Sequence, residues 1–300
     1  MDMTQNKCCR HGASLRRRRR RRRKILRSII FSCSIIAVAV FVAVGSRMIR
    51  SGDGRTNKYD VEARNNTYDN AVIENSKISE KNKIQNNQSM LDDIMNSTQY
   101  PKQLKDLALK NEEALEFVYD YPAEHVKEHT IDLTEEASMD SVPLFVQWDK
   151  RWGYEKYSGN FFAASGCGPT TLSMVVVYLT HNREASPIAV AKYSKEAGYS
   201  VDGSGSSWTL ISEGCMHYGV KAKSVALDES RMKAELDEGH PIVVNVGPGD
   251  FTDTGHFMVI TGYDDEGFSI NDPNSIEKSG KRWLFKNISS QIRAVWSMYV

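Results

Sequence analysis

The stretch SGCGPTT occupies residues 165–171 and is followed by the apolar run Leu172–Leu179. Pro169 is typical of a first helical position, so the stretch predicts a buried helix that begins beside Cys167. Unpaired N–H groups and the positive end of the helix dipole stabilise a thiolate at such a place. We expect Gly166 and Gly168 to leave room for a substrate backbone beside the sulfur. A small structural cysteine that caps a core helix is the alternative interpretation.

The charge of the chain is divided unevenly. Its net charge is +1, but residues 1–27 contain twelve Lys or Arg and one acidic residue, which leaves 27 basic and 37 acidic residues in the rest. The arginine run at residues 16–23 is by itself typical of an arm that binds nucleic acid. The segment that follows the run favours a different interpretation, a basic cytoplasmic tail over residues 1–27 with no nucleic-acid partner.

Residues 28–46 form an uncharged segment rich in Ile, Val, Phe and Ala. As a helix it would extend about 28 Å, close to the roughly 30 Å of a bilayer's hydrocarbon core. The arginines before it predict a cytoplasmic N-terminus, with everything from Arg47 onward exported. We therefore predict a single-pass helix in the cell membrane, with the rest of the chain extracytoplasmic. A cleaved signal peptide is the alternative, because Ala43–Gly45 is small enough for cleavage.

Three further regions are expected after the anchor. Residues 47–97 contain neither Phe nor Trp but nine asparagines between Asn57 and Asn96, which predicts a flexible stem. Residues 98–140 are predicted to be a helical extension, one or two short helices that begin near Pro101, followed by an acidic connector. A domain over residues 141–300 completes the chain.

The domain over residues 141–300 is predicted to have an α+β fold, because its helices come first and its strands afterwards. A loop is expected over 200–207. The predicted helices after the one at Cys167 are Pro187–Ala197, Ser206–Tyr218 and Asp228–Glu238. The predicted strands are Ile242–Val246, His256–Tyr263 and Phe268–Asn271, with a last hairpin around Trp283–Phe285 and Ala294–Tyr299.

The cysteines favour a free thiol at position 167. Of the five cysteines, only Cys167 and Cys215 lie beyond the predicted anchor. One disulfide between them is possible in principle, but both are expected in or beside helices and no disulfide framework is indicated. Cys215 and His217 are two residues apart, so they do not share a helix face and no metal site is predicted.

A nucleophilic cysteine needs a base, and the base needs a partner that orients it. Among the seven histidines, His256 has the most suggestive context, because it follows a glycine and opens a predicted strand. Asp272 ends the next predicted strand and precedes Pro273, and neighbouring antiparallel strands can bring it close to His256. Alone, each has a plainer explanation, a structural histidine and a turn. Together with Cys167 they predict a Cys–His–Asp set.

Four segments carry a resemblance to the papain-like cysteine peptidases related to the double-glycine leader peptidases. They are VPLFVQWDKRW (142–152), SGCGPTT (165–171), TGHFMVITGYD (254–264) and INDPN (270–274). The resemblance implies a papain-like fold, with a helical half that carries the cysteine and an antiparallel sheet that carries the histidine and aspartate. It also implies roles: Gln147 as oxyanion donor, Cys167 as nucleophile, His256 as base and Asp272 as orienting acid.

The segments around this domain differ from those of the leader peptidases, which are built into exporters. No P-loop and no multi-span segment accompany it here, so no ATP is expected. We expect a membrane-anchored extracytoplasmic cysteine peptidase of a Gram-positive bacterium, without cofactor or metal, that cleaves peptide or protein substrates such as cell-wall or surface peptides. The alternatives are a catalytically inactive peptide-binding module and a basic arm that serves a surface receptor.

Overall fold

The computed structural model describes residues 80–300, which belong to the compact unit Ile78–Val300. The predicted tail (1–27), the predicted anchor (28–46) and most of the predicted stem lie outside the described residues. Within residues 80–300, no helix is both long enough and apolar enough to cross a membrane.

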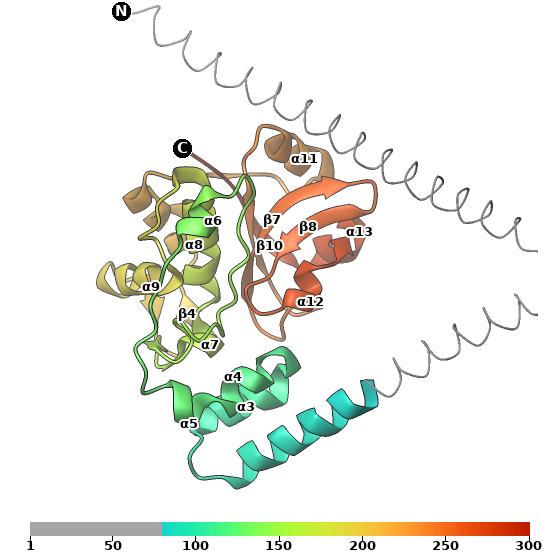
Figure 1. The fold of residues 1–300 in the computed structure, drawn as a ribbon. Coiled ribbons are helices and arrows are strands. Elements are labelled where there is room, and N and C mark those ends of the chain that lie inside the picture. The colour runs from blue at the N-terminus through green and yellow to red at the C-terminus, as the bar shows by residue number, and fades with distance from the viewer. Residues whose placement is uncertain (1–79) are drawn as a thin grey trace, which may run out of the picture. The chain divides into compact units, whose positions relative to one another are not determined.

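A six-stranded antiparallel sheet forms the centre of the fold (Figure 1). Its strand order is β5-β10-β6-β7-β8-β9. The strands are β5 (Lys221–Ser224), β6 (Ile242–Val246), β7 (His256–Asp264), β8 (Gly267–Asn271), β9 (Arg282–Trp283) and β10 (Ile292–Tyr299). Two short hairpins accompany it, β1 (Lys156–Tyr157) with β2 (Asn160–Phe161), and β3 (Ser200–Val201) with β4 (Gly205–Ser206).

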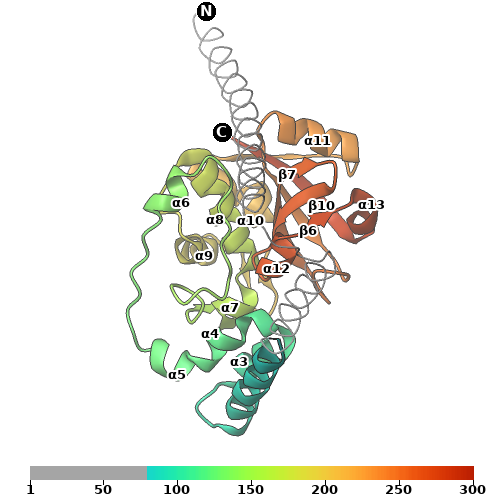
Figure 2. The same ribbon diagram turned by 45° about the vertical axis from the view of Figure 1, so that its right-hand side comes forward.

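Helices cover both faces of this sheet, as the turned view in Figure 2 shows. The helices of the domain are α6 (Thr134–Ser138), α7 (Phe162–Ser165), α8 (Cys167–Thr180), α9 (Pro187–Glu196), α10 (Thr209–Ser212), η2 (Gly214–Tyr218), α11 (Glu229–Asp237), α12 (Ile276–Ser279), α13 (Phe285–Ile288) and η3 (Ser289–Gln291). One core cluster joins α8 and α9 to the sheet through Val243 and Val259, and a second joins α11 and α13 to it through Val244 and Met258. Because both faces are covered, β6 is buried along its whole length, and Asn245 is its only polar residue.

A helical extension precedes the domain and has its own core cluster. It contains a helix over residues 80–96, then α3 (Lys102–Lys110), η1 (Glu112–Ala114), α4 (Leu115–Tyr119) and α5 (Tyr121–Glu124). Leu104, Val118 and the fully buried Ile94 pack with Phe161 and Ala163 of the domain. The extension is therefore part of the same packed unit.

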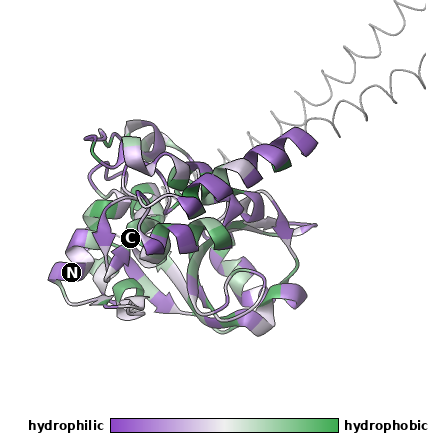
Figure 3. Cartoon of the chain, turned by 90° about the horizontal axis from the view of Figure 1, so that it is seen from below, coloured by the Kyte–Doolittle hydropathy of each residue, from purple (hydrophilic) through white to green (hydrophobic). Residues whose placement is uncertain are grey.

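The helix over residues 80–96 corrects the prediction that the flexible stem continues to residue 97. Most of this helix is exposed and appears in hydrophilic colours in Figure 3, where it joins the grey trace. Ile94 belongs to the core cluster of the extension, and Met90 and Leu91, four and three positions before it, pack against that cluster, whereas Ile84 and Met95 are exposed. The low apolar content of the segment predicted a stem, but a single apolar stripe is sufficient for the helix to pack against the rest of the extension.

Other helices and strands agree with the sequence predictions to different degrees. α9, α11, β6, β7 and β8 lie within one or two residues of their predicted bounds. The predicted helix Ser206–Tyr218 is instead divided among β4, α10 and η2, because Glu213 leaves the helical conformation at φ −127°. The predicted loop over 200–207 contains the β3–β4 hairpin. The expected acidic connector contains α6, whose Ala137 is buried.

The predicted last hairpin is wrong. β9 pairs with β8 at one edge of the sheet, whereas β10 pairs with β5 and β6 on the far side of β7. The segment between β9 and β10 contains α13 and η3, and it carries the chain across the sheet instead of turning it back. β5, the other partner of β10, has two exposed lysines and was not predicted.

Candidate active site

Cys167 is the first residue of α8 and is half-buried. The helix thus begins two residues before Pro169, the predicted start; a proline fits there because the first N–H groups of a helix have no partner within it. The space beside the glycines is occupied by the protein itself, contrary to our expectation. A side chain at Gly166 would come within 2.6 Å of the Phe162 ring, and one at Gly168 within 2.6 Å of the Ser206 hydroxyl.

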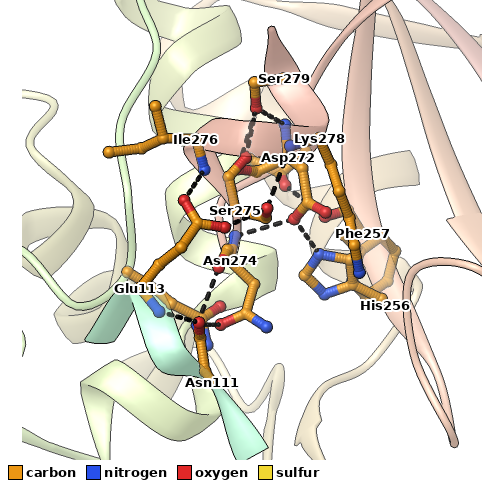
Figure 4. Close-up of polar contacts among 12 residues, drawn as sticks. Asn111, Glu113, His256, Phe257, Asp272, Asn274, Ser275, Ile276, Lys278 and Ser279 are labelled. Atoms are coloured by element: carbon orange, nitrogen blue, oxygen red, sulfur yellow. Dashed lines mark hydrogen bonds and ion pairs between the residues drawn. The ribbon is translucent and has the colours of Figure 1, made fainter. Parts of the chain in front are cut away.

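His256 is the first residue of β7, and Asp272 directly follows β8, its neighbour in the sheet. The His256 Nε2 and the Asp272 Oδ1 are 2.7 Å apart, and both side chains are almost fully buried. Figure 4 shows the imidazole directed at the carboxylate. The Asp272 Oδ1 also accepts a hydrogen bond of 2.8 Å from the Asn274 N–H. These contacts orient the ring, and because Nε2 faces Asp272, Nδ1 is the ring nitrogen that is not bonded to the carboxylate.

The Cys167 thiol and the His256 imidazole lie close enough for each to shift the pKa of the other. Burial alone would raise the pKa of the Cys167 thiol. The nearby imidazole of His256 and its charge, together with the N–H groups of Phe257 and Gly168, outweigh burial and lower the pKa of this thiol. Burial alone would lower the pKa of His256, but the charge and hydrogen bond of Asp272 and the contact with Cys167 raise it to about 10. The two shifts favour a thiolate–imidazolium pair.

Two polar contacts that the sequence did not indicate join the segments that carry this pair. The Thr171 hydroxyl donates to the Phe257 carbonyl at 3.1 Å and so ties the first turns of α8 to the start of β7. The Asn245 amide on β6 donates to the His256 carbonyl at 3.2 Å. Thr171 lies in the stretch around Cys167, so its place in that motif could have marked it as part of the site. Asn245 could have been noticed as the lone polar residue within an apolar strand.

Gln147 lies on the segment before β1 and is buried. Its Nε2 donates to the Ala163 carbonyl in α7 at 2.7 Å, and its backbone N–H donates to the Pro273 carbonyl at 2.7 Å. Gln147 thus connects the turn before Cys167 with the loop that carries Asp272. One hydrogen of its amide is left for another acceptor, and its Oε1 has no hydrogen-bond partner within residues 80–300.

Other candidate groups lie outside this arrangement. Cys215 is a free, fully buried thiol, and burial raises its pKa to about 11. Among the described residues, no cluster of His, Cys, Asp and Glu side chains could hold a metal ion. A surface pocket beside the two short hairpins is lined by Lys156, Ser158, Lys195 and others, and contains none of the four predicted residues.

Solved structures similar to this chain include three peptidase domains. The peptidase domain of Streptococcus ComA, a bi-functional ABC transporter involved in a quorum sensing pathway, is 21% identical with a TM-score of 0.37, covering 45% of this chain and 90% of that one. A C39-like peptidase from Bacillus anthracis is 18% identical with a TM-score of 0.33, covering 53% and 95%. A double glycine motif protease from an AMS/PCAT transporter, in complex with its leader peptide, is 17% identical with a TM-score of 0.35, covering 54% and 94%.

The sequence itself was compared with curated proteins and with protein families. No curated protein matches it. Residues 139–300, more than half of the chain, match the Peptidase_C39 like family. The matched segment contains Gln147, Cys167, His256 and Asp272. The chain belongs to the Peptidase_C39 like family.

Proposed function

We propose that this chain is a cysteine peptidase that hydrolyses peptide bonds through Cys167, His256 and Asp272, with Gln147 as an oxyanion donor. The observation that carries the proposal is the 2.7 Å contact between Asp272 and His256, whose ring in turn lowers the pKa of Cys167 at the start of α8. A structural cysteine needs no such partner, as the buried Cys215 illustrates.

The first half of the reaction forms an acyl-enzyme. The Cys167 thiolate attacks the carbonyl carbon of the substrate, and the carbonyl oxygen becomes an oxyanion. When the tetrahedral intermediate collapses, the C–N bond breaks and the His256 imidazolium gives its proton to the leaving amine. A thioester then joins the substrate's acyl group to Cys167, and His256 is neutral.

The second half releases the acid. His256 takes a proton from water, the hydroxide attacks the thioester carbonyl, and the C–S bond breaks. The thiolate and the imidazolium are thereby restored, so each turnover consumes one water and no cofactor. Asp272 stays hydrogen-bonded to Nε2 throughout, which leaves Nδ1 as the nitrogen that exchanges protons in these steps.

The oxyanion is the group that the site must stabilise most. The Gln147 amide has two hydrogens. One is donated to the Ala163 carbonyl, which fixes the amide in place, and the other is available for the oxyanion. The backbone N–H of Cys167, at the start of α8, is the natural second donor. Donors held in advance cost no reorganisation when charge develops, which is why a buried, pinned glutamine suits this role.

The place of action is part of the same proposal. The uncharged segment 28–46 behind the basic tail supports a single-pass anchor with the peptidase domain outside the membrane. The substrates would then be peptides or proteins at the cell surface. Protease added to intact cells should degrade the part after Arg47 and spare the tail; protection of the C-terminal domain would contradict this topology.

The enzymatic proposal is tested with the full-length chain and a peptide library, with cleavage products identified by mass spectrometry. Cys167→Ala should abolish cleavage, because the covalent route needs the sulfur. Cys215→Ala is the matched control, since it removes a thiol with no such partners, and should leave the products unchanged. Cleavage by Cys167→Ala at the wild-type rate would end the proposal, whereas peptide binding without cleavage by the wild type would favour the peptide-binding module.

A further inference from the structure

The loop that carries Asp272 is held from outside the segment that defines the family. The family match begins at residue 139, whereas Asn111 and Glu113 precede it and reach the segment 272–277. Figure 4 shows both side chains directed at this segment, on the side away from His256. More than 150 residues of sequence separate the partners, so these contacts are long-range features of the fold.

Glu113 receives three hydrogen bonds from the start of α12. Its Oε2 accepts from the N–H groups of Ile276 at 2.8 Å and Glu277 at 3.1 Å, and its Oε1 accepts from the hydroxyl of the buried Ser275. First-turn N–H groups of a helix have no partner within it, so this carboxylate satisfies two of them. One side chain thereby holds the start of α12.

Asn111 holds the residue on the other side of Pro273. Its Nδ2 donates to the Asn274 carbonyl at 2.9 Å and to the Asn274 Oδ1 at 3.0 Å. The indole of Trp148, next to Gln147, donates to the same carbonyl at 3.2 Å. The Asn274 carbonyl is therefore held by the extension and by the segment of Gln147 at once.

Asn274 and α12 are both hydrogen-bonded to Asp272. The Asn274 N–H donates to the same Asp272 Oδ1 that faces His256, at 2.8 Å. The Asp272 N–H donates to the Ser279 hydroxyl in α12 at 2.9 Å. The main chain of Asp272 is thus bonded to α12, whose start Glu113 holds, and its carboxylate is bonded to Asn274, whose oxygens Asn111 holds.

We propose that Glu113 and Asn111 are positioning residues, which hold the segment 272–279 so that the Asp272 carboxylate stays aligned with the His256 ring. The inference rests on the proposed function, because the alignment matters only if the imidazole serves Cys167. It makes the helical extension a working part of the active site. Neither residue touches the reacting atoms, so each acts through Asp272.

The test is made in the full-length chain with two readouts. One is kcat and KM on a peptide that the wild type cleaves in a Cys167-dependent way; the other is the rate of Cys167 alkylation by iodoacetamide against pH, followed by mass spectrometry of the Cys167 peptide. Glu113→Ala should lower kcat about 10-fold with little change in KM, since loss of an orienting partner typically costs 10-fold or more. The alkylation midpoint should move to higher pH, because a misaligned imidazolium stabilises the thiolate less.

Three variants separate positioning from general damage. Glu113→Gln keeps an acceptor for the α12 N–H groups and a group that can bond Ser275, so it should restore most of kcat. Glu112→Ala removes the neighbouring carboxylate, which is exposed and bonded to Asn87, and should match the wild type. Asn111→Ser keeps a capping oxygen for the Glu113 N–H but cannot reach Asn274, so it should repeat the Glu113→Ala effect independently.

A double-mutant cycle gives the decisive outcome. In an Asp272→Ala background, Glu113→Ala should cause no further loss of kcat, because its route to the chemistry is already removed. The inference is overturned if Glu113→Ala and Asn111→Ser keep the wild-type kcat and alkylation midpoint, even if their thermal stability falls. Failure of the proposed function looks different, because then Cys167→Ala itself would still cleave. If Glu113→Ala does not fold, Asn111→Ser carries the same test.

Discussion

Two histidine–carboxylate pairs lie beside the six-stranded sheet, and they differ in their surroundings. His256 and Asp272 are 2.7 Å apart, with side chains 7% and 1% exposed. His240 and Glu235 are 3.1 Å apart, with side chains 32% and 19% exposed. The chemical groups are nearly the same, so the difference between the pairs comes from burial and from their third partners.

The third partner decides what each pair does. The third partner of His256 is the nearby Cys167 thiol, and the charge of the ring lowers the pKa of that thiol. Glu235 instead accepts hydrogen bonds from Ser297 of β10 and Lys223 of β5, which ties α11 to one side of the sheet. We therefore expect the first pair to serve reactivity and the second to serve stability.

The largest expected effect compares the two described cysteines, only one of which contacts a histidine–carboxylate pair. At pH 7, Cys167 should react with iodoacetamide at least about 10³-fold faster than Cys215, because the thiolate is the reactive form and the pKa of Cys215 is raised to about 11. Peptide mass spectrometry of the native chain measures both rates, and the denatured chain is the control in which they should converge. Equal rates in the native chain would remove the distinction between the two pairs.

The second prediction compares removal of the histidine from each of the two pairs. His256→Ala should lower turnover by about 10³-fold, because the thiol loses its base and the leaving amine loses its acid. His240→Ala is the matched substitution in the other pair and should leave turnover within about twofold, since its ring bonds Glu235 and packs beside Tyr299, and neither belongs to the proposed site. Initial rates on one cleaved peptide measure both. A similar loss in the two variants would mean that damage to the sheet, and not the third partner, explains the effect.

The third prediction concerns the oxyanion donor Gln147 and distinguishes its effect on turnover from the effect of the His256 pair on the Cys167 thiol. Gln147→Ala should lower kcat by about 10²–10³-fold, or about 3–4 kcal/mol in the barrier, because one donor to the oxyanion is lost. Alkylation of Cys167 should keep its pH midpoint, since the bonds of Gln147 go to Ala163 and Pro273 and not to the pair. A shifted midpoint would show that the substitution disturbs the loop that carries Asp272.

Much of this site could be predicted because its signals are local. A glycine-flanked cysteine before an apolar run, a histidine that opens a strand and an aspartate that ends the next strand are each visible within a few residues. Two neighbouring antiparallel strands then bring His256 and Asp272 together, whatever the rest of the fold does. The bounds of β6, β7 and β8 followed from the same local patterns.

The remaining features depend on contacts between distant segments, and a single sequence carries no signal for them. Whether β10 pairs with β9 or inserts between β5 and β6 depends on where the α13 segment crosses the sheet. Glu113 stands in a run of acidic residues, and nothing local separates it from the exposed Glu112. The roles of Gly166 and Gly168 were misjudged for the same reason, since Phe162 and Ser206 fill the space beside them.

The smallest effect is expected at the second pair and depends on pH. Burial alone would raise the pKa of Glu235, but hydrogen bonds from Ser297, His240 and Lys223 lower it from 4.5 to about 2. Because the pKa is depressed in the folded state, the carboxylate stabilises the fold above pH 4.5, and the contribution disappears as the pH falls toward 2. Glu235→Gln should therefore lower the free energy of unfolding by about 1 kcal/mol at pH 7, a modest value because the pair is partly exposed to solvent and salt.

Thermal unfolding of the full-length chain, followed by tryptophan fluorescence at pH 7 and at pH 3, measures this contribution. The difference between Glu235→Gln and the wild type should shrink at pH 3, and turnover at pH 7 should be unaffected. Glu238→Gln removes an exposed carboxylate next to the end of the same helix and should match the wild type at both pH values. A difference that stayed constant with pH would mean that Glu235 acts through packing, because only a charge contribution is lost when the carboxylate is protonated.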